Sequence, residues 1–139
     1  MAGTVTFTFT KIEKPYDVNG IIKLEIAWAC DSGASTITTA TMTTADYIKY
    51  LKGRYCVLGV TDPGSTAPTA AYDIEILDEY SCDIFGGTLH DRSATATEQA
   101  FPLLTAGYWN KRLITSALSF AVSGNSVNAA TGKCILYFE

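Results

Sequence analysis

The segment 88–99, TLHDRSATATEQ, contains the residue types of a hydrolytic site, including the chain's one histidine. His90, Asp91 and Ser93 would supply a general base, an acid that orients it and a nucleophile. Such a triad requires the fold to bring the side chains together, and adjacent loop residues point their side chains apart. We therefore expect a solvated polar loop here, with a partner contact as the alternative, and no catalytic residue.

Two other kinds of chemistry also lack support in the sequence. Asp73 and Glu75 project from one face of a predicted strand, as a pair of glycosidase carboxylates would. However, acids that alternate with isoleucines are typical of any half-exposed strand. Gly86 and Gly87 lack the further glycines and the lysine of a phosphate-binding loop. We expect no enzymatic activity and no cofactor.

The four cysteines are predicted to be reduced and mostly buried. Three of them belong to alternating apolar series: Cys30 follows Ile26 and Trp28, Cys56 precedes Leu58 and Val60, and Cys134 precedes Leu136 and Phe138. Disulfides are the alternative that an even number of cysteines allows. A metal site is not expected, because no two cysteines have the short spacing of zinc ligands.

Tyr47, Tyr50, Tyr108 and Trp109 are of the residue types that form sugar-stacking platforms. Tyrosine and tryptophan are equally suited to strands and to protein interfaces, which gives a competing interpretation. The sequence leaves both open.

The elements that must position these residues are predominantly β-strands, because apolar and polar residues alternate along much of the chain. The alternation is clearest in TVTFTFTKI, GIIKLEIAWAC and YDIEILDE, and further strands are predicted at 54–61, 112–124 and 132–139. One short helix is predicted over 45–52, capped by Thr44 and ended by Gly53. The whole chain, 1–139, therefore predicts one all-β domain, a jelly roll or two-sheet β-sandwich with long loops and at most one short helix.

The charge of the chain excludes several classes of partner. The net charge is −4, only 17% of the residues are charged, and the lysines and arginines are scattered apart from two small groups. No basic stripe is present to bind nucleic acid or an anionic membrane. The N-terminal residues lack the pattern of a signal peptide, and no apolar run approaches the ~20 residues of a membrane helix, so we expect synthesis in a cytoplasm. Large uncharged areas are typical of a protein that works against partners.

Several turn and strand motifs along the chain, taken together, carry a family resemblance. They are TDPGSTAPTAAYDIEILDE, then DIFGG, then Arg92 and Ser93, then the closing SGN and GKCILY. This combination resembles the capsid cement, or decoration, proteins of short-tailed bacteriophages, those of the Bordetella phage group in particular, over nearly the whole chain. The resemblance implies a jelly-roll protein on the outside of the virion head, where it clamps neighbouring major capsid proteins and pairs with a second copy of itself. No catalytic residue comes with this family.

Partner contacts are expected in the irregular segments 31–45 and 88–110, which lack the pattern to build a core. Large aromatics and arginine dominate interface energetics, so the predicted contacts are Tyr108, Trp109, Arg112 and Arg92. A symmetric homodimer is expected through edge strands at either terminus. The alternatives are a carbohydrate-binding module of a tail fibre or collar, and a head–tail adaptor protein.

Overall fold

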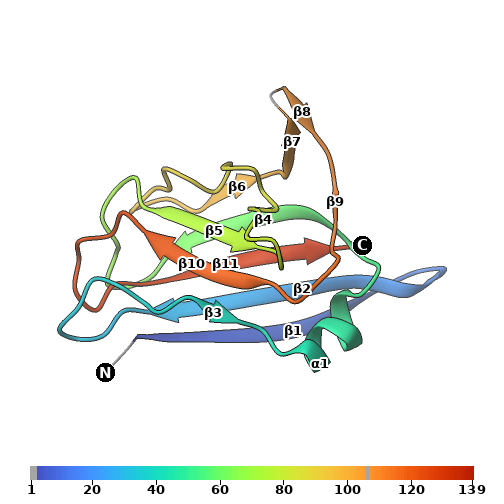
Figure 1. The fold of residues 1–139 in the computed structure, drawn as a ribbon, viewed down its shortest axis with the longest axis horizontal. Helices are drawn as coiled ribbons and strands as arrows, with labels where there is room; N and C mark the ends of the chain where they lie inside the picture. The colour runs from blue at the N-terminus through green and yellow to red at the C-terminus, as the bar shows by residue number, and fades with distance from the viewer. Residues whose placement is uncertain (1–2, 106) are drawn as a thin grey trace.

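The computed structural model describes residues 3–105 and 107–139, which form eleven β-strands and one short helical segment (Figure 1). The largest sheet contains, in spatial order, β1 (Thr4–Lys14), β2 (Asp17–Ala29), β11 (Thr131–Phe138), β4 (Tyr55–Pro63) and β6 (Glu98–Ala100), and β9 (Arg112–Leu113) also pairs with β4. The second sheet contains β3 (Ala40–Thr41), β10 (Ser119–Ser123) and β5 (Asp73–Leu77), and a separate hairpin contains β7 (Leu103–Thr105) and β8 (Tyr108–Trp109). All pairs are antiparallel, so the predicted all-β class is confirmed.

The first two sheets share one hydrophobic core, built from the inward residues of their alternating strands. The large sheet contributes Ile22, Leu24, Ile26, Trp28, Cys134, Leu136 and Phe138, and the smaller sheet with its flanks contributes Tyr72, Ile74, Ile76, Leu118 and Phe120. The rings of Trp28 and Tyr72, one from each side, lie with their centroids 5.9 Å apart. Burial of each such side chain stabilises the fold by roughly 1.5–3 kcal/mol, so the core holds the two sheets together.

The chain passes between the two sheets at most of its long connections. β2 and β4 lie in the large sheet, whereas β3 and β5 lie in the smaller one, and the chain returns from β10 to β11 in the large sheet. β1 instead forms a hairpin with β2 and lies at the edge of the large sheet. β11 lies between β2 and β4, so the prediction of an edge strand holds for β1 and is wrong for the C-terminal strand. The alternating pattern shows which face is buried, but not which strands are neighbours.

One predicted set of inward residues in β4 is wrong. Cys56 is fully buried, but Leu58 and Val60 are only partly buried, and Gly59 and Thr61 occupy the inward positions instead. The pairing of β4 with β11 shifts register after Cys56, where one extra residue enters β4. A bulge of this kind reverses which residues point inward. A Cβ at Gly59 would lie 2.8 Å from the ring of Phe85, so the core there requires a glycine.

The single strand predicted over 112–124 is two short strands in different sheets. β9 pairs with β4 in the large sheet, and β10 pairs with β3 and β5 in the smaller one. The residues between them cross from one sheet to the other. Ile114 and Leu118 lie in this crossing segment, and both are buried in the core. The predicted inward positions are therefore confirmed for Ile114, Leu118 and Phe120, whereas Val122 is only partly buried.

The predicted helix is present, but most of it is π-helical. One α-helical turn, α1 (Thr44–Asp46), leads into η1 (Tyr47–Leu51), and the backbone turns at Gly53 with φ of +77°. The cap is Thr43 and not Thr44, because the Thr43 hydroxyl accepts the hydrogen bond from the Asp46 amide at 3.1 Å. No helix within 3–105 and 107–139 is long and apolar enough to span a membrane.

The cysteines allow a direct test of the core. Cys30, Cys56 and Cys134 are buried as predicted, and Cys82 is exposed in the turn after β5. Burial raises the pKa of the Cys56 thiol to about 12 and also raises the pKa of Cys134, which suppresses the reactive thiolates. In a thiol-labelling experiment we expect one cysteine to react rapidly in the native protein and all four to react after unfolding without reductant. A smaller number in the unfolded chain would indicate a disulfide.

Candidate functional site

The hairpin of β7 and β8 projects from the two-sheet body (Figure 1). Leu103 pairs with Trp109 and Thr105 with Tyr108, with an irregularity between the pairs. Gly107, with φ of +84°, supplies the positive φ of the turn at little steric cost. The sequence predicted an irregular connection here, so the hairpin is a correction to that prediction. Its residues are apolar on both faces, which removes the alternation by which strands are recognised.

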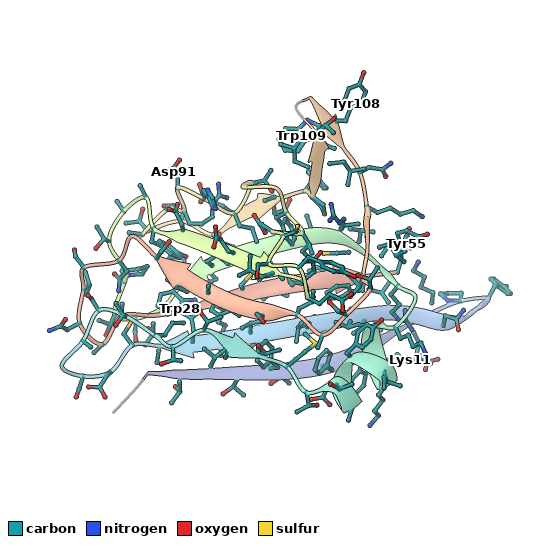
Figure 2. All side chains as sticks on the ribbon, in the orientation of Figure 1. Lys11, Trp28, Tyr55, Asp91, Tyr108 and Trp109 are labelled. Carbon is teal, nitrogen blue, oxygen red and sulfur yellow. The ribbon has the colours of Figure 1, made fainter. Side chains whose placement is uncertain are left out.

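Four large apolar side chains at this hairpin are exposed to solvent: Phe101 (54%), Leu104 (43%), Tyr108 (72%) and Trp109 (60%). Figure 2 shows Tyr108 pointing away from the body and Trp109 on the side of the hairpin that faces the loop of Asp91. The two predicted aromatic contacts are therefore neighbours in space but face different surroundings. Phe101 and Leu104 were not predicted, although the run FPLL is the most apolar part of the connection.

A cavity of about 620 Å³ lies on the Trp109 side of the hairpin. Its lining includes His90, Asp91, Arg92, Gln99, Phe101 and Trp109. The loop after β5 and Gln99 of β6 therefore supply the polar groups, and Phe101 with Trp109 of β8 supplies the aromatic rings. The cavity joins two groups of residues that the sequence had assigned separately, the polar loop and the aromatic contacts.

Arg92 holds the polar loop in place. Its Nε donates to the backbone oxygen of His90 at 2.8 Å, and its Nη1 lies 3.4 Å from Oε2 of Glu98. The side chain is only 15% exposed, so most of it is enclosed by the loop and β6. Arg92, which was predicted to contact a partner, is therefore already used by the fold. Nη2 is the guanidinium atom that takes part in neither of these two internal interactions.

His90, Asp91 and Ser93 do not form a triad. The Ser93 hydroxyl accepts hydrogen bonds from the amides of Thr95 and Ala96 at 3.1 and 2.9 Å, which makes it the cap of a turn. The His90 Nε2 atom lies 3.6 Å from a Glu75 carboxylate oxygen, with no hydrogen-bond partner among the described residues. The arrangement supports a polar loop.

The turn at Ser93 gives a quantitative test of this interpretation. We expect Ser93→Ala to lower the free energy of unfolding by about 1 kcal/mol, because two amides lose their acceptor. Urea unfolding of the purified chain measures this change. We expect His90→Ala to change this free energy less than Ser93→Ala does, because the Nε2 atom of His90 has no hydrogen-bond partner to lose among the described residues. Equal free energies of unfolding for Ser93→Ala and the native chain would contradict the capping role of Ser93.

Arg112, the remaining predicted contact, lies away from the cavity lining. It belongs to β9, and its Nη2 atom is 4.0 Å from Oδ2 of Asp78. The side chain is 34% exposed, which leaves part of the guanidinium accessible. The structure therefore brings Arg92 and Trp109 into one cavity, Tyr108 next to it, and Arg112 to a separate surface.

The sugar-stacking platform of four aromatics is not formed. Tyr50 stacks on Phe9, with centroids 4.5 Å apart and planes inclined by 6°, and Tyr47 packs against the core. Both belong to η1, which directly follows α1, and Figure 1 shows α1 on the side of the body opposite to β7 and β8. The aromatic residues that line the cavity beside the hairpin are Phe101 and Trp109.

Comparison with known proteins finds no matching family model, curated protein or solved structure. Within 3–105 and 107–139, no three His, Cys, Asp or Glu side chains are grouped so that they could hold a metal ion. The function is therefore inferred from the surfaces of the chain.

Proposed function

We propose that the chain is a structural virion protein, a cement protein that binds the outer surface of a phage head and clamps neighbouring major capsid proteins. One observation carries the proposal: the β7–β8 hairpin presents Leu104 and Tyr108 to solvent at a projecting tip. An exposed apolar hairpin of this kind is expected to be covered by a partner. The low share of charged residues, 17%, also suits a protein that spends its lifetime against a neighbour.

The mechanism is cross-linking of capsid seams. A shell under pressure from packaged DNA opens where capsomers meet. A protein bound across such a seam adds its binding free energy, which must be overcome before the seam can open. The aromatic hairpin supplies one contact, and the segment 31–45, which contains β3 and the start of α1, supplies a second at another part of the surface. Many copies act together on a rigid lattice, so modest contacts suffice. The proposed location is the outside of the capsid after synthesis in the host cytoplasm.

We further infer that the two sheets are wound as a jelly roll. The spatial orders β2-β11-β4-β6 and β3-β10-β5 support it, because successive strands from β2 to β5 alternate between the sheets. Double-sheet jelly rolls are common in viral capsid proteins. The β1 strand is then an addition at the edge of the larger sheet.

The proposed homodimer is formed through the free edge of β1. This strand pairs with β2 without interruption from Thr4 to Ile12 and lies at the end of its sheet. Residues 3–10 contain no charged residue and no proline, the usual devices that protect an exposed edge. Two antiparallel copies of β1 would extend both sheets across a twofold axis.

We expect analytical ultracentrifugation at micromolar concentration to detect the dimer, and Thr8→Lys to abolish it. A charge on the exposed face of β1 would meet its own copy near the twofold axis. Thr66→Lys, which adds the same charge in the exposed loop before β5, is the matched control. A native chain that is monomeric both free and in a map of the virion would contradict the proposal.

The copy number in purified virions tests the cement function against its alternatives. A shell protein is present in hundreds of copies, whereas a fibre, a collar module or an adaptor is present in about a dozen, as the symmetry of each structure requires. Quantitative mass spectrometry relative to the major capsid protein gives this number. A count of about a dozen would replace the cement function by one of the alternatives.

A further inference from the structure

We propose that the cavity beside the β7–β8 hairpin binds a neutral sugar, with the rings of Trp109 and Phe101 against the pyranose and the polar groups of the same cavity on its hydroxyls. The inference goes beyond the cement function, since it concerns a small ligand and a different face of the hairpin. It rests on the size of the cavity, its combination of aromatic and polar side chains, and its charge.

The size and the aromatic wall suit a small cyclic ligand. The volume of about 620 Å³ falls in the range of small-molecule sites, roughly 300–1,000 Å³. Trp109 and Phe101 line it while remaining 60% and 54% exposed, so their ring faces are available to a ligand. The C–H face of a pyranose is apolar, and an aromatic ring is the side chain that packs best against such a surface.

The cavity also contains polar groups that the fold does not use. Gln99 is exposed, and its side-chain amide has no hydrogen-bond partner among the described residues. The Asp91 carboxylate also has no hydrogen-bond partner among the described residues. Nη2 of Arg92 makes neither of the two interactions that hold the rest of the guanidinium group. The amide and the carboxylate each present two atoms side by side, and Nη2 adds one donor. Adjacent sugar hydroxyls match this spacing.

The charge of the cavity favours a neutral ligand over an anion. Arg92 is the one permanent cation of the lining, and Glu98 and Asp91 lie beside it. The carboxylate of Glu75, 3.6 Å from His90 Nε2, adds to the negative side. A phosphate or carboxylate would therefore meet net repulsion. An apolar side chain of a protein partner would leave the Asp91 and Gln99 groups buried without partners, which is costly.

The chain carries its own reporter of occupancy. It has two tryptophans, and Trp28 is buried with 3% exposure, so an added quencher reaches Trp109 almost alone. We expect a bound sugar to protect Trp109 from quenching by iodide. The probes are the methyl glycosides of glucose, galactose, mannose and N-acetylglucosamine, with glycerol as the acyclic control. For a ligand of this size, a dissociation constant of about 1 mM is expected.

Variants separate this site from the capsid contact. We expect Gln99→Ala and Asp91→Asn each to weaken sugar binding about tenfold, while occupancy on heads stays unchanged. Asparagine suits position 91, where φ is +54°. We expect Tyr108→Ser to have the opposite effects, with sugar binding kept and head occupancy lost. Urea unfolding of each variant verifies that the fold is intact.

Two results would overturn the inference. One is that none of the four glycosides protects Trp109 more than glycerol does at tens of millimolar, well above the expected dissociation constant. The other is protection that persists unchanged in both Gln99→Ala and Asp91→Asn. Either result leaves the cement function standing, because that function is measured by head occupancy and not by sugar binding.

Discussion

Tyr108→Ser is expected to weaken binding of the protein to phage heads roughly thirtyfold. The side chain is 72% exposed at the end of the hairpin and points away from the body (Figure 2), so the fold gains little from it. Large aromatic side chains at the centre of an interface contribute about 2 kcal/mol or more, which corresponds to this factor. Heads that lack the protein, incubated with increasing concentrations of the purified variant, give the dissociation constant directly.

Tyr80→Ser is the matched control for Tyr108. Tyr80 is equally exposed, at 76%, but lies in the turn after β5 and not on the hairpin. We expect this variant to bind heads as the native protein does. Trp109→Ala is expected to lower occupancy as well, since it removes the neighbouring ring of β8. If Tyr108→Ser and Tyr80→Ser had the same affinity for heads, the hairpin would not be the contact.

Asn125→Ala is expected to lower the free energy of unfolding by about 3 kcal/mol and the melting temperature by about 10 °C. The Asn125 side-chain oxygen accepts from the amides of Thr69 and Val127 at 3.0 and 3.1 Å. Its amide nitrogen donates to the backbone oxygens of Ser35 and Val127 at 2.8 and 3.0 Å. One half-buried side chain therefore joins three loops at one end of the sheets, and its removal leaves several backbone groups without partners.

Two further variants at asparagine positions make this test specific. Asn125→Asp keeps the acceptor but turns the donor into an oxygen that faces two carbonyl oxygens, so we expect at least the same loss of stability. Asn110→Ala removes one exposed hydrogen bond, to the amide of Lys111 at 2.8 Å, and should change the free energy of unfolding little. Equal stability of Asn125→Ala and Asn110→Ala in urea would contradict the role of Asn125.

The β-rich class was predictable because one face of most long strands is buried. In β2 and in the strand that follows Tyr72, apolar and polar residues alternate with the pleat, and the inward residues are almost completely buried. A period of two is a local property, so it can be read without knowledge of the neighbouring strands. The same reasoning located β1 and β11.

The errors have non-local causes. Leu58 and Val60 were assigned inward because their spacing from Cys56 is regular, but a register shift opposite β11 reverses the pattern. The crossing between β9 and β10 was hidden because Ile114 and Leu118 stay buried while the chain changes sheets. Neither the register shift nor the change of sheet alters the local pattern of apolar and polar residues.

The candidate site was predictable only in part. Tyr108 and Trp109 were identified by residue type, and both are exposed. Phe101 and Gln99 were missed, because their role follows from a cavity that forms only when β6, the loop after β5 and the hairpin come together. Tyr47 and Tyr50 were grouped with Trp109 by type alone, although a stack on Phe9 and the core occupy them.

The resistance of phage heads to rupture tests the central claim most directly. Heads with and without the protein are heated or diluted into low salt, and release of DNA is followed with time. The cement function predicts that heads without the protein rupture at lower temperature, and that added native protein restores their resistance while Tyr108→Ser does not. If heads that lack the protein entirely were as resistant as complete heads, the protein would not be a cement protein.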